Sequence, residues 1–390
     1  MKVCMVSTTH RPTDGRIFQK EARSLAKAHT VTVIAPGATA ETTTEEQVRI
    51  VTVQQPGSFA LHPITLLRVF RECWRQDADV YHCHEPDALL IGMALRVLRG
   101  KRVIYDVHEH WPTEIPFDLH VAQGSRLQRV LTAIVDPLEL FLARRADGTI
   151  AVSDSVAERF RDAGLDPVII ANYSIADLEI PCTPRREGKR ILYMAGNMQA
   201  FHGIRECILA VSQVFSRHPD ASLTLVGNVR DDVGAIVPDE HTRERIHTTG
   251  FLPYRRMYET LGAGEIGLLV FQPAYYNISI GLPNKLFDYM LVGLPVVASD
   301  FPEIRNVVND AGCGILVDPT DIGAIADAVT YLLENPDEAR QMGENGRRAI
   351  EQRYNWGRME TSLLALYRNL NGEAPVSGRP AEPASEEGLQ

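Results

Sequence analysis

The sequence predicts an α/β protein with two doubly wound parallel sheets, one in each of two domains. Short apolar segments alternate with segments of helical period along most of the chain, which is typical of parallel strands joined by helices. The alternation is interrupted at the hydrophilic stretch PCTPRREGKR (181–190) and then starts again. The length of 390 residues is sufficient for two hydrophobic cores.

The first domain is predicted over residues 1–172 and is followed by a linker over 173–189, where prolines and charges interrupt the pattern. Its strands are expected at 2–7, 30–35, 48–53, 79–84, 102–107, 148–152 and 168–171. Its helices are expected at 14–28, 61–75, 86–99, 125–145 and 154–163.

The second domain is predicted over residues 190–352. Its strands are expected at 191–195, 223–226, 245–248, 266–271, 295–298 and 314–317. Its helices are expected at 203–217, 254–262, 283–292, 321–334 and 336–350. An amphipathic helix at 356–370 lies within the segment 353–371, and the tail 372–390 is too rich in Pro, Glu, Ser and Gly to order itself.

The composition excludes several classes of protein. Apolar residues make up 45% and charged residues 23% of the chain, as in an ordinary soluble enzyme. The net charge of −10 argues against a nucleic-acid partner, because phosphate backbones need a basic surface. Six scattered cysteines without a CxxC pair predict reduced thiols and a cytoplasmic location. No apolar run approaches the roughly 18 residues of a membrane-spanning helix.

The most informative motif is SIGLPNKLFDYMLVGLPVVASDFPE, at 279–303. Lys285 and Asp288 are three residues apart on its predicted helix and therefore share a face. The apolar run that follows predicts a buried parallel strand, and a loop with Asp300, Pro302 and Glu303 is expected after it. Ligands of doubly wound sheets bind at the carboxyl ends of the strands. A cation and a carboxylate offered together there suit the phosphates and sugar hydroxyls of a nucleotide sugar.

A second motif, AGNMQAFHGIREC (195–207), connects a predicted strand to a predicted helix. Its small residues, Gly196 and Gly203, allow backbone amides to approach an anion, and a helix N-terminus favours negative charge. The side chains of Asn197 and His202 are candidate donors to a diphosphate. An ordinary strand-to-helix turn is the alternative interpretation.

Four histidines gather at two predicted strand ends, in HCH (His82, His84) and HEH (His108, His110). Strand alternation brings the members of each pair to the same side. One interpretation is an acceptor or transferred-sugar pocket. The other is a zinc site, since imidazole is a common zinc ligand.

Two predicted helices, 61–76 and 126–145, combine apolar residues with several arginines. Basic amphipathic helices of this kind can lie on an anionic bilayer. Packing of the same apolar residues into the core is the alternative.

The chain resembles the family-4 glycosyltransferases of the GT-B fold, in which two Rossmann-like domains face a cleft. The resemblance extends from residue 1 to about 370. The motifs that carry it are TDGRIFQKEARSLAKAHTVTVIA, DVYHCHEPDALLIG, KRVIYDVHEHWP, LPNKLFDYMLVGLPVVASDFPE, GCGILVDPTD and YNW. In this family the last helix crosses back onto the first domain, which implies the same for 353–371.

The resemblance implies a role for each candidate residue. Asp288 matches an acidic residue that binds the ribose hydroxyls, and Lys285 would lie near the phosphates or the transferred sugar, as a catalytic residue with His108 at the sugar end of the cleft. The remaining donor-binding candidates are Gly15, Arg16, Gly196, Asn197, His202, Gly203 and Asn284. On the acceptor side the candidates are His84 and Glu109.

Two departures from the family pattern affect the expected site. The position eight residues before Asp288, commonly Glu in the family, is Ile280. The Arg and Lys usual in the phosphate loop are replaced by Asn197 and His202.

The expected function is transfer of a sugar, with retention, from a UDP- or GDP-sugar to an acceptor hydroxyl in cell-envelope polysaccharide or glycoconjugate synthesis. The expected acceptor is a carbohydrate or a lipid-linked sugar, and no metal or other cofactor is expected. The expected location is the cytoplasm, with peripheral contact at the inner membrane face through 61–76 or 126–145. Three alternatives remain at this point: a nucleotide-sugar epimerase, a binding protein without activity, and a zinc-dependent hydrolase that uses His82, His84, His108 and His110.

Overall fold

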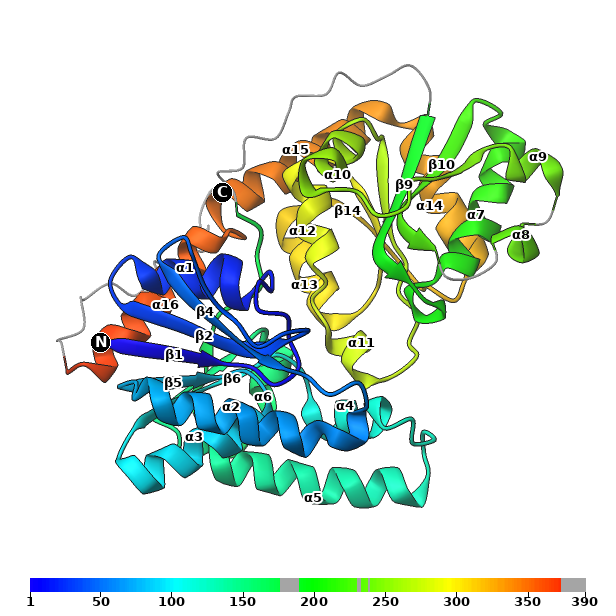
Figure 1. The fold of residues 1–390 in the computed structure, drawn as a ribbon. Helices are drawn as coiled ribbons and strands as arrows, with labels where there is room; N and C mark the ends of the chain where they lie inside the picture. Colours follow the sequence, from blue (N-terminus) through cyan, green and yellow to red (C-terminus); the bar gives the residue numbers. More distant parts are fainter. Residues whose placement is uncertain (176–188, 230–232, 238, 373–390) are drawn as a thin grey trace. The chain divides into compact units, whose positions relative to one another are not determined.

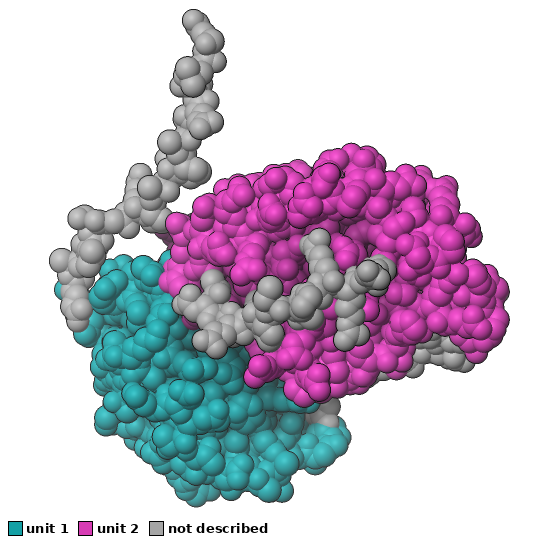
Figure 2. All heavy atoms as spheres, turned by 90° about the horizontal axis from the view of Figure 1, so that it is seen from above, with its two compact units in different colours: residues 1–105, 145–149, 360–390 teal, residues 106–144, 150–359 magenta. Residues whose placement is uncertain are grey.

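The computed structural model describes residues 1–175, 189–229, 233–237 and 239–372 (Figure 1). Most of the predicted linker over 173–189, and all of the predicted tail over 372–390 except Gly372, lie outside the described residues. The chain divides into two compact units (Figure 2). Unit 1 comprises Met1–Tyr105, Arg145–Thr149 and Glu360–Gln390, and unit 2 comprises Asp106–Arg144 and Ile150–Met359. The predicted domain boundaries differ from these and stay a prediction.

The first sheet has eight strands in the order β3-β4-β2-β1-β5-β6-β7-β8. Their bounds are β1 Lys2–Val6, β2 Thr30–Gly37, β3 Thr42–Glu45, β4 Val48–Gln54, β5 Val80–Cys83, β6 Arg102–Val107, β7 Gly148–Ala151 and β8 Val168–Ile169. Strand β1 pairs in parallel with β2 and β5, as do β2 with β4, β5 with β6 and β7 with β8, whereas β3 is antiparallel to β4. Strand β3 was not predicted, because its sequence TTTE is exposed throughout and has no apolar alternation.

The helical segments of this part of the chain have the bounds η1 Ile17–Ala22, α1 Arg23–Ala26, η2 Phe59–Leu61, α2 His62–Gln76, α3 Pro86–Arg99, α4 Trp111–Asp118, α5 Arg126–Ala143 and α6 Asp154–Asp162. The helix predicted at 14–28 is in fact a π-helical turn followed by one α-helical turn, and it begins at Ile17. Helix α4 was not predicted. Pro112 and Pro116 lie within it, and proline in a sequence normally argues against a helix interior.

The second sheet has six parallel strands in the order β11-β10-β9-β12-β13-β14. Their bounds are β9 Lys189–Met198, β10 Ala221–Val229, β11 Ile246–Thr248, β12 Ile266–Leu269, β13 Val296–Ser299 and β14 Gly314–Val317. The order runs outward from β9 in both directions, so the sheet is doubly wound, as predicted.

The helical segments that accompany the second sheet are η3 Ala200–His202, α7 Ile204–Arg217, α8 Val233–Ile236, α9 Glu240–Arg243, α10 Tyr254–Gly262, α11 Tyr276–Ile280, α12 Asn284–Leu291, α13 Pro302–Ala311, α14 Ile322–Glu334 and α15 Pro336–Gln352. The loop predicted after the strand at 295–298 was wrong in part. Helix α13 starts there with Pro302 in its first turn, a position that tolerates proline because its N–H group would be unpaired anyway.

Both faces of the second sheet are covered. Along β9, Ile191 and Tyr193 point into a core shared with α7 and α14, whereas Leu192 and Met194 point into a core shared with α10, α12 and α13. This alternation is that of a strand buried on both sides. Each fully buried large side chain contributes about 1.5–3 kcal/mol to the stability of the sheet that carries the site.

The last helix, α16 (Trp356–Leu370), ends in unit 1. There the Tyr367 hydroxyl lies 3.0 Å from His82 Nδ1, and both side chains are buried. Among the described residues, no helix has both the length and the apolar character needed to cross a bilayer.

Candidate functional site

The candidate site in unit 2 is built on the carboxyl end of β9 and the N-terminus of α7. Gly203 is the N-cap of α7 and has a φ of +76°. A Cβ at this position would lie 1.9 Å from the Val270 carbonyl oxygen, so only glycine fits. The Gln272 N–H donates to the Phe201 carbonyl at 2.9 Å and ties the loop to the end of β12. The loop is therefore held closely against the sheet.

His202 is a neutral side chain within this loop. Burial, together with the nearby charge of Lys285, lowers the pKa of His202 to about 3. The Gln199 N–H lies 3.0 Å from Nδ1, which therefore acts as the acceptor. The proton of the neutral ring is then on Nε2, and that atom can donate a hydrogen bond to an anion.

Lys285, in the first turn of α12, is a buried cation. Its Nζ atom has no hydrogen-bond partner among the described residues and lies 4.6 Å from the centroid of the Phe271 ring. Burial lowers the pKa of Lys285 to about 7, and the charge of Asp288 only partly opposes this effect. A buried ammonium group without a hydrogen-bonded partner is costly, so the site is suited to an anionic ligand.

Asp288 lies one turn further along α12 and has fixed partners. Its Oδ1 atom accepts hydrogen bonds from the Tyr258 hydroxyl at 2.6 Å and from the Ser174 hydroxyl at 3.4 Å. The Tyr258 hydroxyl also lies 3.1 Å from that of Tyr254. Burial and the negative charge of Asp288 raise the pKa of Tyr258, so its hydroxyl stays protonated and donates to the carboxylate. A carboxylate oriented in this way can accept hydrogen bonds from hydroxyl groups of a ligand.

The structure therefore brings His202, Gly203, Lys285 and Asp288 together in unit 2, as the sequence motifs suggested. Around Gly196 the space that a Cβ would occupy is open, which leaves room for a ligand. Asn284 is the first residue of α12 and is exposed. Asn197 lies in β9, and its side chain is outside the described part of the structure.

A second group of candidates follows β6, also in unit 2. His108 Nε2 lies 3.0 Å from Oδ2 of the buried Asp106, and Glu109 is exposed. A carboxylate partner of this kind orients the imidazole ring. Their predicted roles, in catalysis and on the acceptor side, remain predictions.

Sequence reasoning missed Asn277, on the short helix α11. Its Oδ1 atom accepts a hydrogen bond from the His110 N–H at 2.8 Å, and its Nδ2 atom donates to Glu114 Oε2 at 2.5 Å. Burial raises the pKa of Glu114, and burial with the charge of Arg159 lowers that of His110 to about 4. No sequence signal pairs residues so far apart. Ile280, at the end of α11, is buried and adds no polar group.

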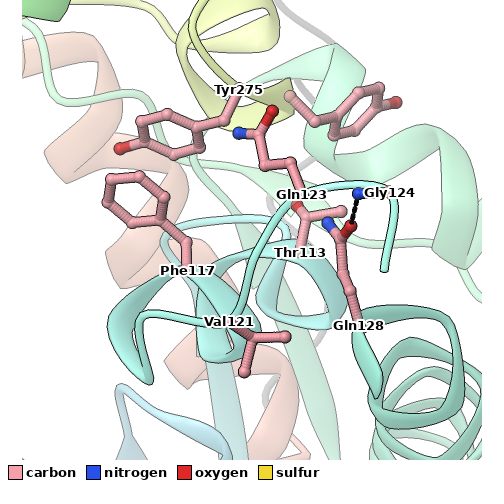
Figure 3. Close-up of a pocket in the computed structure, with 8 residues that line it drawn as sticks. Thr113, Phe117, Val121, Gln123, Gly124, Gln128 and Tyr275 are labelled. Carbon is pink, nitrogen blue, oxygen red and sulfur yellow. Dashed lines mark hydrogen bonds between the residues drawn. The ribbon is translucent and has the colours of Figure 1, made fainter. Parts of the chain in front are cut away.

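A pocket of about 150 Å³ lies beside this junction of α4 and α11 (Figure 3). The rings of Phe117 and Tyr275 stack in it with centroids 4.0 Å apart. Thr113, Gln123 and Gln128 add polar groups to its lining, and Gln128 Oε1 accepts a hydrogen bond from the Gly124 N–H at 2.5 Å. Aromatic faces next to amide and hydroxyl groups form a surface that can contact a sugar.

The other candidates lie in unit 1. Gly15 has open space around it, whereas the buried Arg16 side chain pairs with Glu21, with 3.0 Å between Nε and Oε1. His84 is fully buried and stacks on His82 at 4.7 Å, which gives its predicted acceptor role no support. The roles of Gly15 and Arg16 in binding the diphosphate stay predictions.

The buried group of Glu21, His82 and His84 has ligand atoms near enough for one metal ion. The donor set is compatible with zinc, but the Arg16 guanidinium already supplies a positive charge beside Glu21. The predicted alternative with four histidine ligands is not favoured. His110 Nδ1 lies 3.0 Å from the Thr113 hydroxyl, and His108 contacts Asp106.

Two α/β domains with largely parallel sheets are the architecture of GT-B glycosyltransferases. The family description "Glycosyltransferase Family 4" matches residues 15–172, and "Glycosyl transferases group 1" matches residues 178–349. Together these matches cover most of the chain, and the chain belongs to the family-4 glycosyltransferases of the GT-B fold.

Individual proteins agree with this assignment. The chain is 28% identical over 380 residues to the phosphatidyl-myo-inositol mannosyltransferase of Mycobacterium leprae, a match that covers 92% of each chain. It is 24% identical over 259 residues to the alpha-D-kanosaminyltransferase of Streptomyces kanamyceticus, which covers 62% of this chain and 66% of the relative.

Solved structures show the same fold. Sucrose-phosphate synthase from Thermosynechococcus elongatus matches with a TM-score of 0.77 at 17% identity, and the match covers 96% of this chain and 100% of that chain. HepE from Anabaena, solved in complex with UDP, matches with a TM-score of 0.70 at 16% identity, over 95% of this chain and 100% of that chain. The predicted fold class is confirmed, and the chain is a glycosyltransferase.

Proposed function

We propose that the chain transfers a sugar from a nucleotide diphosphate sugar, UDP- or GDP-linked, to an acceptor hydroxyl. The observation that carries this proposal is the buried Lys285 ammonium group, which has no hydrogen-bonded partner among the described residues, one helical turn from Asp288. A nucleotide sugar supplies a diphosphate for the cation and ribose hydroxyls for the carboxylate. The UDP complex of HepE supports the same donor class.

In this proposal the chemistry consists mainly of electrostatic stabilisation. The leaving diphosphate gains negative charge in the transition state, and donors already fixed around it lower the barrier. Lys285 and the Nε2–H of His202 donate to the phosphate oxygens, with the amides of Gly196, Asn197 and Gly203. The N-terminus of α7 adds about 0.3–1 kcal/mol of favourable interaction with an anion.

The remaining roles in the proposal follow the family resemblance. Asp288 binds the ribose and Asn284 adds to the donor site of unit 2, and no metal or other cofactor takes part. Gly15 and Arg16 keep the donor-binding roles that the resemblance implies. His108, oriented by Asp106, lies at the transferred sugar, with Glu109 on the acceptor side. Transfer proceeds with retention of the anomeric configuration.

We further propose a carbohydrate or lipid-linked acceptor and a role in cell-envelope polysaccharide or glycoconjugate synthesis at the cytoplasmic face of the membrane. The similarity to a phosphatidyl-myo-inositol mannosyltransferase supports an acceptor with a lipid portion. The pocket that contains Phe117 and Tyr275 supplies aromatic and amide groups for a sugar ring of that acceptor.

A thermal-shift screen against UDP, GDP and their common sugars identifies the donor. Stabilisation by one nucleotide and its sugars, lost in Lys285→Met and Asp288→Ala, is the expected result. No shift with any of these ligands would argue against the proposal. NMR of the first product formed from the identified donor then tests retention, which an inverted anomeric configuration would contradict.

A further inference from the structure

Helix α5, whose course can be followed in Figure 1, carries a stripe of large apolar side chains that are exposed along one face. Five large apolar side chains along it are each between 47% and 57% exposed: Leu127, Val130, Ile134, Leu138 and Phe141. Their spacing of three or four residues keeps them within about 80° of the helix circumference. The helix has 18 residues and is therefore about 27 Å long. Large apolar residues lined up on one exposed face mark a surface that meets another apolar phase.

The opposite face of α5 is packed and its acidic residues are neutralised within unit 2. Glu139 and Ala143 are buried, and the Thr132 hydroxyl donates to the Pro112 carbonyl at 2.8 Å. The Arg159 guanidinium binds Asp136 Oδ1 at 2.6 Å and Glu139 Oε2 at 2.5 Å. The two acidic side chains of the helix are thus directed away from the stripe.

Basic residues lie at both ends of the stripe. Arg126 and Arg129 are exposed in the first turn, and Arg144 and Arg145 are exposed directly after the last residue of the helix. Arg144 also donates to the Ala163 carbonyl at 2.9 Å, a neutral oxygen that leaves the positive charge of the guanidinium in place. An apolar stripe between two pairs of arginines is complementary to a surface in which anionic groups lie next to an apolar layer. The headgroup region of an anionic bilayer has this character.

The same charges disfavour a second copy of the chain as the occupant. In an antiparallel pair of α5 helices, Arg126 and Arg129 of one copy would face Arg144 and Arg145 of the other. In a parallel pair each arginine would face its own counterpart. Both arrangements put like charges together at the edge of the apolar contact.

Helix α2, the other helix predicted to meet a bilayer, is less suited. The Arg99 guanidinium covers the Trp74 ring at 3.7 Å. Arg68 donates to the Gln54 carbonyl and Arg75 pairs with Glu72, so two of its basic residues are engaged within unit 1.

We propose that α5 lies on an anionic bilayer, with its apolar stripe at the level of the headgroups and with Arg126, Arg129 and Arg144 on lipid phosphates. This names the surface of the chain that would contact the membrane in the proposed function, and the contact does not depend on glycosyl transfer. The binding is measured on vesicles without donor or acceptor, so a failure here is distinguishable from a failure of glycosyl transfer.

The test is co-sedimentation of the full chain with vesicles of phosphatidylcholine alone and of equal parts phosphatidylcholine and phosphatidylglycerol. The variant Ile134→Glu/Leu138→Glu puts two charges in the stripe. Its matched control, Val97→Glu/Leu98→Glu, changes two residues on α3 that are 81% and 61% exposed. A second variant, Arg126→Glu/Arg129→Glu, reverses the charge at one end, and thermal unfolding checks that all three remain folded.

Binding to the anionic vesicles is expected, with little binding to phosphatidylcholine and a decrease as ionic strength rises. The stripe variant should bind at least about tenfold more weakly, because two apolar side chains are lost from the contact, and the α3 control should bind like the wild type. Equal binding of wild type and stripe variant would overturn the proposal. So would a dimer in light scattering that the stripe variant dissociates, because the stripe would then be a protein interface.

Discussion

The Lys285 Nζ atom lies 4.6 Å from the centroid of the Phe271 ring and makes no hydrogen bond to any described residue. An ammonium group can gain a modest interaction with an aromatic face, but this does not replace its lost hydration. Because the charged form loses more in hydration than it gains from the ring, the pKa of Lys285 is lowered to about 7. Without a ligand, the buried ammonium group of Lys285 therefore lowers the free energy of unfolding, and an anionic ligand bound beside it removes this penalty.

Lys285→Met should stabilise the protein without ligand. In the unfolded chain the lysine keeps its proton up to its ordinary pKa of 10.5, whereas in the folded chain it loses the proton near pH 7. The charged lysine therefore lowers the free energy of unfolding by its full amount below pH 7. This penalty declines to zero as the pH rises from 7 to 10.5. Thermal unfolding should show a higher Tm for the variant at pH 6 to 7 that converges with the wild type at high pH. A gain in Tm that does not vary with pH would contradict the lowered pKa of Lys285.

Donor affinity should depend on the protonation of Lys285. Above about pH 7 the free protein loses this proton, so affinity for the nucleotide sugar should fall by up to about tenfold per pH unit. A nucleotide sugar is the right probe, because its diphosphate has no terminal phosphate group that titrates in this range. Calorimetric titration at several pH values measures the slope, and Lys285→Met, as the control, should bind weakly with no slope.

Tyr258→Phe should weaken donor binding by removing the 2.6 Å hydrogen bond to Asp288. A hydrogen bond to a charged group contributes about 1.5–3 kcal/mol, so a rise in donor KM of at least about tenfold is expected with a smaller change in kcat. Tyr254→Phe is the matched control, since it loses only the hydroxyl contact to Tyr258. Equal effects of the two variants would show that Tyr258 does not act through Asp288.

Asp288→Ala should affect ligands according to their ribose hydroxyls. Affinity for the identified nucleotide should fall at least about tenfold, whereas affinity for its 2′,3′-dideoxy analogue should change little. Calorimetric titration of both ligands on both proteins gives the comparison. A similar loss for both ligands would mean that Asp288 acts on another part of the donor.

Gly203→Ala should destabilise the protein, and Gly196→Ala should not. The first substitution forces a Cβ to 1.9 Å from the Val270 carbonyl oxygen at a φ of +76°, whereas the second meets open space. A loss of at least about 2 kcal/mol is expected for Gly203→Ala, measured by denaturant unfolding, and less than about 1 kcal/mol for Gly196→Ala. A reversed order would contradict the described loop.

Much of the fold could be predicted from the sequence because its signals are local. Strand β14 and the two halves of the chain follow from apolar runs and helical periods that need no knowledge of distant contacts. Helix α4 was missed because its prolines argue against a helix, and β3 was missed because pairing with β4, not its own pattern, makes it a strand. Tertiary pairing overrides local propensity in such places.

For the candidate site too, contacts within one helix could be predicted from the sequence, whereas contacts between distant segments could not. The proximity of Lys285 to Asp288 could be predicted, because both lie on one helix face. The hydrogen bond from Tyr258 and the connection of Asn277 to Glu114 could not, because each joins segments that are distant in sequence. The sequence also does not show whether a buried cation has a hydrogen-bond partner. For Lys285 the structure shows none among the described residues, and the proposed function rests on this observation.

The most direct test of that argument is donor turnover by the full chain. Release of nucleotide diphosphate from the identified nucleotide sugar is measured with and without an acceptor extract, for the wild type, Lys285→Met and Lys27→Met. Lys27 is the matched control, an exposed lysine of unit 1 that pairs with Glu360. The account predicts acceptor-stimulated release by the wild type, release by Lys285→Met reduced by at least about a hundredfold, and near-normal release by Lys27→Met. Unchanged release by Lys285→Met would contradict it.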